Sequence, residues 1–269
     1  MLHFRCTGID FHVMEAAPRV GVPGALPSTP PASDAVRSVA RAFKLLTLFT
    51  PDRPRATLTE LAQHSDLAIS TVSRLLATLE SLQLVRRLET GAWGLGVRVL
   101  QLGAAARETF DLIGIAEPVL EKLNRATGEN TNLAMRIDNE SFTYVRQFMS
   151  RHPVRHATWV GKTQPLKGTA NGAVLIGNIP HEGYVATHKT VEPEISAIAA
   201  PIYGPGSEVI ASLSVTGPTY RMTERKVSRY AKLLVDGAAR LSHALQADES
   251  GSKRARRING DLQRKHEMS

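Results

Sequence analysis

Residues 57–87 read TLTELAQHSDLAISTVSRLLATLESLQLVRR, and this stretch decides the fold of the first part of the chain. Thr57 and Glu60 have the spacing of a capping box, which marks the start of a helix. After His64 a second helical pattern begins, with Ser70 or a near neighbour as its cap. Its apolar positions are Val72, Leu75, Leu76, Leu79 and Leu82. Two helices separated by a loop of this length predict a helix-turn-helix.

The flanking residues extend this motif on both sides. After it, residues 84–88 have strand character, residues 89–91 are turn residues and residues 92–95 form a second strand, which together predict a β-hairpin. Before it, an apolar stripe typical of a short helix ends at Pro51. The stripe consists of Val39, Ala42, Phe43, Leu46 and Phe49. We therefore expect a winged helix-turn-helix domain over residues 34–96.

The third predicted helix has a slim face, rich in hydroxyl groups, opposite its leucines. This face carries Ser70, Thr71, Ser73 and Arg74. Hydroxyl and guanidinium groups near a helix N-terminus can bond phosphates and reach base edges in the major groove of DNA. Arg86 and Arg87 on the hairpin are placed to contact the DNA backbone or the neighbouring minor groove. The alternative interpretation is a three-helix packing unit with no role in DNA binding.

Composition indicates a basic globular protein with no export signal. The chain has 269 residues, 42% of them hydrophobic, and a net charge of +8. Residues 33–96 hold eight basic and six acidic residues, so the charge excess does not single out the DNA-binding region. The basic run 253–257 is typical of a solvated tail. A lone cysteine, Cys6, and the absence of a long apolar stretch point to a reducing compartment, the cytoplasm, and to no membrane partner.

Composition and periodicity divide the rest of the chain into segments. Residues 1–33 are rich in proline and read as a disordered leader, in which Met14 is a second candidate start. We expect residues 97–111 to form a linker helix, residues 112–247 an α+β domain with an antiparallel sheet, and residues 248–269 a basic flexible tail. The elements expected in the α+β domain are strands at 132–137, 142–148, 154–159, 195–203 and 208–216, a short helix at 170–176 and a last helix at 223–247.

These residues resemble one family of bacterial transcription factors, the isocitrate-lyase-regulator (IclR) family. The resemblance spans residues 36–247 and rests on the segments just quoted, on Trp93-Gly94-Leu95-Gly96, on Thr127-Gly128-Glu129-Asn130 and on Ser214-Val215-Thr216-Gly217-Pro218. It implies a winged helix-turn-helix, a linker helix used in dimerisation, and a C-terminal domain that binds a small effector, often an organic or aromatic acid. It also implies binding of a double-stranded DNA operator by a homo-oligomer, either a dimer or a tetramer.

The resemblance also indicates a shortened effector domain. Only ten residues separate Gly172 from Gly183-Tyr184, where family members carry a longer stretch with further helices. The family's effector contacts would fall here on Ala170, Asn171, Thr187, Ala197, Ser214 and Thr216. Because Ser214 and Thr216 are two apart on a predicted strand, their hydroxyls face one side and could bind a carboxylate, helped by amides at the start of the short helix. The alternative is that both hydroxyls satisfy local backbone groups.

Enzyme, metal and cofactor functions find no support in the sequence. There is no G-x-S-x-G motif, no P-loop and no dinucleotide fingerprint. His152 and His156 are four apart, but on a predicted strand, and His181 and His188 have no obvious carboxylate companion. We therefore expect a non-enzymatic regulator without metal or cofactor. Two alternatives remain: a DNA-binding protein that responds to no effector, and a module that binds proteins.

Overall fold

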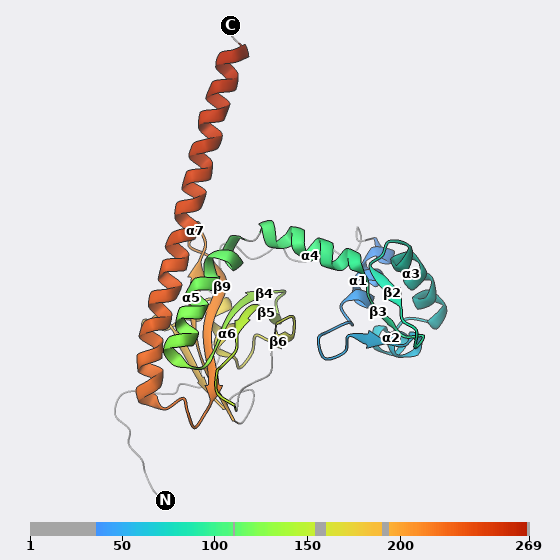
Figure 1. The fold of residues 1–269 in the computed structure, drawn as a ribbon, viewed down its shortest axis with the longest axis horizontal. Helices are drawn as coiled ribbons and strands as arrows, with labels where there is room; N and C mark the ends of the chain where they lie inside the picture. The colour runs from blue at the N-terminus through green and yellow to red at the C-terminus, as the bar shows by residue number, and fades with distance from the viewer. Residues whose placement is uncertain (1–35, 110, 154–159, 190–193, 268–269) are drawn as a thin grey trace, which may run out of the picture.

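The chain forms two units joined by the helix α4 (Val97–Thr109), as Figure 1 shows. The expected leader, residues 1–33, lies outside the described residues. This computed structural model describes residues 36–109, 111–153, 160–189 and 194–267, with the backbone alone for 107–109, 111 and 247–267.

The N-terminal unit is a winged helix-turn-helix, as predicted. Its helices are α1 (Arg37–Leu46), α2 (Leu58–Ser65) and α3 (Ile69–Ser81), and its strands are β1 (Arg55–Ala56), β2 (Val85–Arg87) and β3 (Trp93–Leu95). The strands pair antiparallel in the order β1-β3-β2. Strand β1 was not predicted, because two residues carry no periodicity and the strand is defined by its pairing with β3, Arg55 with Gly94 and Ala56 with Trp93.

Helix α1 buries only part of its predicted apolar stripe, because Ala42 and Leu46 pack against the core and the other half of the stripe faces outward. Val39 and Phe43 are 53% and 63% exposed, whereas Leu45 is completely buried and Phe49 lies in the core beyond the helix end. The helix carries apolar residues on more than one side, so its sequence pattern alone does not select the face that meets α2 and α3. The core of the unit therefore forms around Leu45, and α1 keeps an apolar stripe on its outside.

The helix-turn-helix itself follows its sequence signals closely. The Thr57 hydroxyl accepts the Glu60 backbone N–H at 3.3 Å, and the Glu60 carboxylate accepts the Thr57 backbone N–H at 2.7 Å, which completes the predicted capping box. The bonds that the Thr57 backbone N–H and hydroxyl donate to the Glu60 carboxylate hold the pKa of Glu60 below its ordinary value. Helix α3 starts at Ile69 with Ala68 as its N-cap and no capping side chain, so Ser70 lies inside the first turn. The helix buries Val72, Leu76 and Leu79, while Leu82 is exposed.

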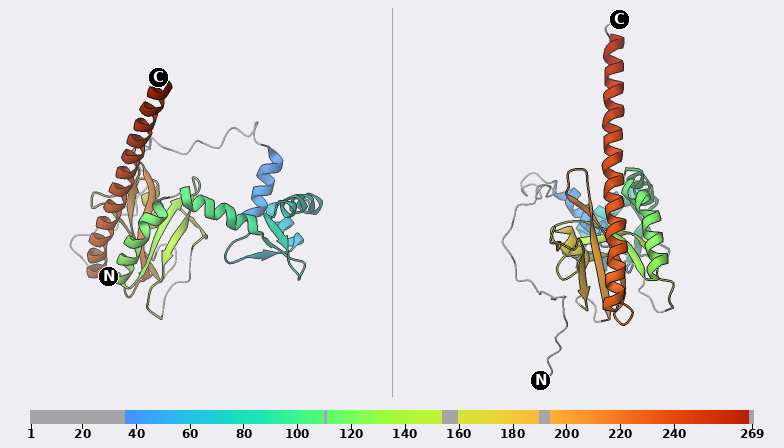
Figure 2. Two further views of the ribbon diagram at one scale, coloured as in Figure 1. Left: turned by 45° about the horizontal axis from the view of Figure 1, so that its top comes forward. Right: turned by 90° about the vertical axis from the view of Figure 1, so that its left-hand side faces the viewer.

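The C-terminal unit is an α+β domain built on a six-stranded antiparallel sheet in the order β6-β5-β4-β9-β8-β7. Helices α5 and α7 cover one face of the sheet and bury its main core, and α6 lies on the other face (Figure 2, right). The elements are α5 (Asp111–Thr127), β4 (Asn130–Arg136), β5 (Ser141–Phe148), β6 (Thr163–Pro165), α6 (Ala170–Leu175), β7 (Val185–His188), β8 (Ile195–Tyr203), β9 (Val209–Pro218) and α7 (Glu224–Glu267).

Most strands of this sheet were predicted. Strand β8 has the expected bounds, and β4, β5 and β9 agree with their expected bounds within two residues. The strand expected at 154–159 lies outside the described residues. Strands β6 and β7 were missed because each has at most four residues and lies at a sheet edge, where alternation is too short to be recognised.

Helix α7 corrects the expected end of the chain. The sequence predicted a helix ending near Ala247 followed by a flexible tail at 248–269, but the helix continues to Glu267 and runs well past the sheet (Figure 1). Residues 248–267 contain no proline, and their alternating charges are compatible with a helix. Within the described part of the chain, no helix combines the length and apolar character that crossing a membrane requires.

Candidate DNA interface and effector face

Helix α3 presents the predicted DNA-binding residues to solvent. Ser70, Ser73 and Arg74 are exposed and Thr71 is half-buried, because the leucine side of the helix faces the core. No ion pair or hydrogen bond to a described residue engages the Arg74 guanidinium. The face therefore offers small hydroxyl groups and one unpaired positive charge, which is the chemistry that a major groove and its phosphates accept.

The wing adds further arginines. Arg86 and Arg87 are exposed on β2. In the sheet register Arg86 lies opposite Gly94, and Gly94 lies opposite Arg55 on β1, so Arg55 and Arg86 share one face of the wing. Arg55 was missed because β1 was not recognised, although Arg53-Pro54-Arg55 marks a basic segment in the sequence. The cationic surface of the wing is thus wider than the hairpin alone.

A cavity of about 1020 Å³ lies beside the wing. It is bounded by the arginines of the wing, by the segment before β1 and by Gly161 of the C-terminal unit. The residues around it are Phe49, Thr50, Pro51, Pro54, Arg55, Arg86, Arg87, Leu88, Glu89, Thr90, Gly94, Leu95 and Gly161. The cavity therefore separates a basic face of the N-terminal unit from the C-terminal unit.

Strand register brings four of the predicted effector residues onto one face of the large sheet. Thr187, Ala197 and Thr216 lie side by side across β7, β8 and β9, and Ser214 lies in the next row on the same face. Ala197 and Thr187 are half-buried, whereas Ser214 and Thr216 are buried. Helix α6 packs on this same face, so the structure also brings Asn171 to it.

An amide that the sequence analysis did not single out organises the two hydroxyls. Asn132 on β4 donates from Nδ2 to Ser214 Oγ at 3.4 Å and to Thr216 Oγ1 at 3.1 Å. Gln147 on β5 in turn donates to Asn132 Oδ1 at 2.8 Å. The hydroxyls thus accept from a side chain rather than from local backbone groups. Because a hydroxyl that accepts one bond keeps its own hydrogen, both can still donate.

Asn171 belongs to a second polar network on this face. Its Nδ2 donates to the Tyr144 hydroxyl at 3.1 Å, and its Oδ1 accepts from Ser212 Oγ at 2.9 Å. The sequence signal for Ser212 was its alternation with Ser214 and Thr216 along β9, and Tyr144 had no signal beyond strand alternation. Both networks consist of neutral amides and hydroxyls, so they suit hydrogen-bonding ligand groups.

The start of α6 differs from what the sequence suggested. Thr169 caps the helix, and its hydroxyl accepts the Gly172 backbone N–H at 2.8 Å while its carbonyl accepts the Ala173 backbone N–H at 3.0 Å. Two of the amides expected to help bind a carboxylate are therefore engaged within the helix. Ala170 is buried and belongs to the apolar cluster between α6 and β8.

A buried ion pair fixes the end of the sheet next to this face. Arg221 donates from Nε to Glu129 Oε1 at 2.7 Å and from a terminal nitrogen to Oε2 at 2.8 Å. The Glu129 side chain is 2% exposed and the Arg221 side chain 12%. The hydrogen-bonded Glu129 carboxylate raises the pKa of Arg221. This bidentate pair ties the start of β4 to the segment between β9 and α7.

The histidines do not form a metal site in the part of the chain that the structure describes. No group of three or more histidine, cysteine or acidic residues clusters there. His181 pairs with the neighbouring Glu182, and His188 Nδ1 lies 2.9 Å from Ser196 Oγ. His152 bonds through its backbone to Ser150, and His156 lies outside the described residues.

Comparison with known proteins identifies the family. The model described as the IclR helix-turn-helix domain matches residues 38–89, and the model of the C-terminal domain of the bacterial transcriptional regulator IclR matches residues 104–182 and 176–243. The chain therefore belongs to the IclR family of transcriptional regulators. Its place in this family makes it a DNA-binding transcriptional regulator and not an enzyme.

Individual relatives agree with this assignment. The chain is 26% identical over 244 residues to the HTH-type transcriptional regulator KipR of Bacillus subtilis, covering 78% of this chain and 97% of KipR. A crystal structure of an IclR transcriptional regulator from Alicyclobacillus acidocaldarius is 26% identical, with a TM-score of 0.70, 79% of this chain covered and 99% of that one. An IclR homologue from Microbacterium hydrocarbonoxydans, crystallised with 4-hydroxybenzoate, has the same fold at 21% identity and TM-score 0.65, covering 78% and 99%.

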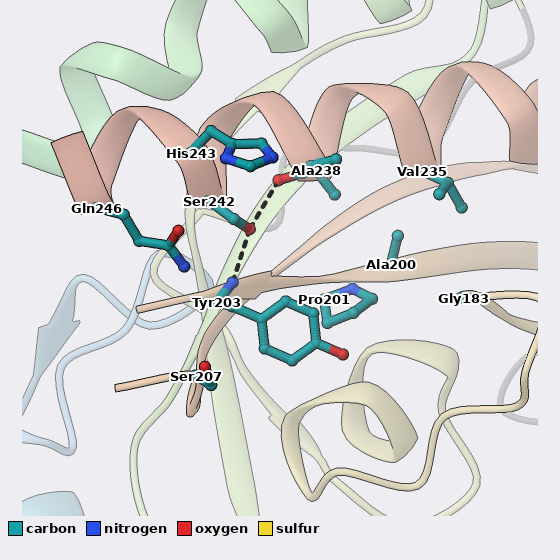
Figure 3. A pocket seen from close by; sticks show the side chains of 11 residues that line it. Gly183, Ala200, Pro201, Tyr203, Ser207, Val235, Ala238, Ser242, His243 and Gln246 are labelled. Carbon is teal, nitrogen blue, oxygen red and sulfur yellow. Dashed lines mark hydrogen bonds between the residues drawn. The ribbon is translucent and has the colours of Figure 1, made fainter. Parts of the chain in front are cut away.

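The short stretch between Gly172 and Gly183 is also visible in the family match and in the structure. The C-terminal family model matches in two pieces that overlap at residues 176–182, as expected if part of the domain is missing there. Gly183, just beyond this junction, borders a cavity of about 440 Å³ between α7 and β8. Figure 3 shows Ser242 at its side, accepting the Tyr203 backbone N–H at 2.9 Å and donating to the Ala238 carbonyl at 2.9 Å. The cavity lies where β7 no longer pairs with β8.

Proposed function

We propose that this regulator binds a specific DNA operator as a homo-oligomer, in the cytoplasm, and that a small effector bound by its C-terminal domain changes its affinity for that operator. The observation that carries the DNA contact is the exposed α3 face with Arg74, next to a wing whose Arg86 and Arg87 have no ion-pair partner among the described residues. In a helix-turn-helix the second helix of the motif enters the major groove.

The roles of these residues follow from their positions. Arg86 and Arg87 on the wing neutralise phosphates, and this contributes affinity for any sequence. Ser70, Thr71, Ser73 and Arg74 near the start of α3 reach base edges and therefore contribute sequence preference. Specific recognition requires α3 in the groove and the wing on the backbone at the same time.

Substitutions should separate the two roles. Arg86→Ala is expected to weaken binding to all sequences and to lower the slope of log affinity against log salt by about 1, because one phosphate contact is lost. Ser70→Ala and Thr71→Ala are expected to change the preference among operator variants and leave the salt slope unchanged. Fluorescence anisotropy with DNA from upstream of the chain's own gene measures both quantities. Wild-type behaviour in all three variants would contradict the proposed interface.

The outer surface of the winged domain supports the homo-oligomer. Val39 and Phe43 on α1, and Val97 and Leu100 on α4, are all more than half exposed. Large apolar side chains gathered on two helices of one protomer are typical of a surface that another subunit covers. We propose that a second copy buries them, so that two winged domains are presented together to two half-sites.

The effector site that we propose is the face of the large sheet that holds Asn171, Ala197, Ser214 and Thr216, with Thr187 at its edge and Ala170 beneath it. Its support is the pair of hydroxyls held by Asn132, which keep hydrogens to donate to a carboxylate or phenol oxygen. A small organic or aromatic acid is the ligand class that fits these donors. The Microbacterium homologue provides a first probe, because its crystal structure contains 4-hydroxybenzoate.

Thermal unfolding with small carboxylic and phenolic acids tests this site. A ligand that binds only the native state at 100 times its Kd is expected to add about 2.7 kcal/mol to the free energy of unfolding, and so to raise the melting temperature. Thr216→Val is expected to reduce that shift because it removes one donor. No shift with any of these acids, together with intact DNA binding, would favour a DNA-binding protein that responds to no effector. Absent DNA binding would favour a protein-interaction module.

A further inference from the structure

Besides the linker, the described parts of the two units contact each other between the segment before β1 and the segment before β6. Lys162 Nζ lies 2.8 Å from Asp52 Oδ1, which joins the segment before β1 to the segment before β6. Next to this ion pair, Gly161 has a φ of +78°, and a Cβ added to it would lie 3.4 Å from Pro51 Cγ. An ion pair therefore joins Asp52 to Lys162, and Pro51 lies close to Gly161.

The N-terminal half of this contact is a tight turn held on the winged domain. Thr50 and Arg53 exchange backbone hydrogen bonds at 3.0 and 3.2 Å, which places Pro51 and Asp52 at the tip. Arg53 Nε donates to the Leu48 carbonyl at 3.1 Å, and Phe49 is buried in the core of the unit. The tip is therefore fixed to the winged domain, and the two move together.

The C-terminal half is bonded to the candidate effector face. The Gly161 backbone N–H donates to the Tyr144 carbonyl at 3.0 Å, and Thr143 Oγ1 donates to the Lys162 carbonyl at 3.1 Å. The hydroxyl of the same Tyr144 accepts from Asn171 on α6. One residue of β5 thus holds the contact through its backbone and the proposed effector site through its side chain.

The contact also determines what the wing faces. With Asp52 and Lys162 paired, Arg55, Arg86 and Arg87 border the cavity of about 1020 Å³ that Gly161 also borders. That volume is at the upper end for a small-molecule site, and a DNA duplex does not fit inside it. We expect that docking of this face of the wing on DNA moves the two units apart.

We propose that the contact of Pro51-Asp52 with Gly161-Lys162, here called the latch, holds the winged domain in an arrangement with low DNA affinity. Binding of a ligand next to Asn171 changes the stability of the latch through Tyr144. This inference rests on the proposed function. A partly exposed ion pair is weak and screened by salt, so the latch opens at little free-energy cost. Such a contact shifts populations between two arrangements without locking either of them.

Charge reversal at Lys162 distinguishes the latch from the direct effect that lost positive charge has on DNA binding. Lys162→Glu removes positive charge, which by itself weakens binding to DNA, but the latch predicts an affinity increase of about two- to five-fold, because the closed form is destabilised. The double variant Asp52→Lys/Lys162→Glu keeps the net charge, restores the pair and is expected to return the affinity toward the wild-type value. Lys167→Glu, the same change at an exposed site nearby, is the matched control and is expected to give no increase.

Anisotropy titration with the upstream DNA fragment gives the readout. If Lys162→Glu and Lys167→Glu weaken binding equally, or if the double variant does not revert, the latch is wrong. If the wild type itself shows no DNA binding that depends on Arg86, the proposed function fails instead. The two failures are therefore distinguishable.

Cross-linking tests the contact without DNA. In a Cys6→Ser background, Asp52→Cys/Lys162→Cys is expected to form an intrachain cross-link with a short bismaleimide, and the linked protein is expected to bind the upstream fragment less tightly than the unlinked protein. Adding Tyr144→Phe removes the bond to Asn171 and is expected to change the cross-linking rate. Equal DNA affinity after linking would overturn the latch, and an unchanged rate with Tyr144→Phe would overturn its coupling to the effector face.

Discussion

Glu129→Gln is expected to lower the free energy of unfolding of the C-terminal unit by about 3–5 kcal/mol, because it leaves the charge of Arg221 buried without its counter-ion. The Arg221 side chain is only 12% exposed and bonds both carboxylate oxygens, so solvent cannot replace Glu129. Neutral glutamine keeps the shape but offers one oxygen in place of two. Urea unfolding followed by circular dichroism measures the difference.

The matched control is Glu121→Gln on α5. Glu121 pairs with Arg125, but both side chains are exposed, 43% and 61%. Exposed pairs on one helix contribute about 0.3–0.5 kcal/mol, so this variant should stay close to wild type. Equal effects of the two substitutions would show that burial of the Glu129 pair does not matter.

Gly172→Ala is expected to lower the free energy of unfolding by about 2–3 kcal/mol. A Cβ at this position would lie 1.8 Å from the carbonyl oxygen of Leu166, and the neighbour is backbone, so α6 itself must move. Movement of α6 displaces Asn171 and with it the bonds to Tyr144 and Ser212. We therefore also expect loss of any melting-temperature shift with carboxylic acids.

The same substitution at Gly114 should have the opposite sign. Gly114 lies on the exposed side of α5, and a Cβ there would meet no atom within 4 Å. Alanine is favoured over glycine inside helices, so Gly114→Ala is expected to raise the free energy of unfolding by about 0.5–1 kcal/mol. A stabilising effect at both positions would contradict the tight approach of α6 to Leu166.

The winged domain was predictable because its signals are local. The capping box of Thr57 and Glu60, the leucine side of α3 and the turn at residues 89–91 each depend on residues close together in the chain. Strands β8 and β9 were likewise predictable from their length and from the turn at residues 204–207. Such features depend on local geometry, which can be predicted from a single sequence.

What the sequence did not reveal depends on contacts between distant residues. The role of Asn132 arises because strand register places β4 beside β9, and no local pattern specifies that register. Val39 and Phe43 belong to the predicted apolar stripe of α1, yet they stay exposed and Leu45, outside that stripe, enters the core. The ion pair between Asp52 and Lys162 joins two domains, so neither residue has a signal of its own.

Specific DNA binding through α3 and the wing can be measured in a single titration. The wild-type protein is titrated by fluorescence anisotropy against its own upstream fragment and against a scrambled fragment of equal length, at several salt concentrations. We expect the upstream fragment to bind about 10³-fold or more tightly, with an affinity for both fragments that falls steeply as salt rises. Equal affinity for the two fragments, or an affinity that does not respond to salt, would contradict the claim.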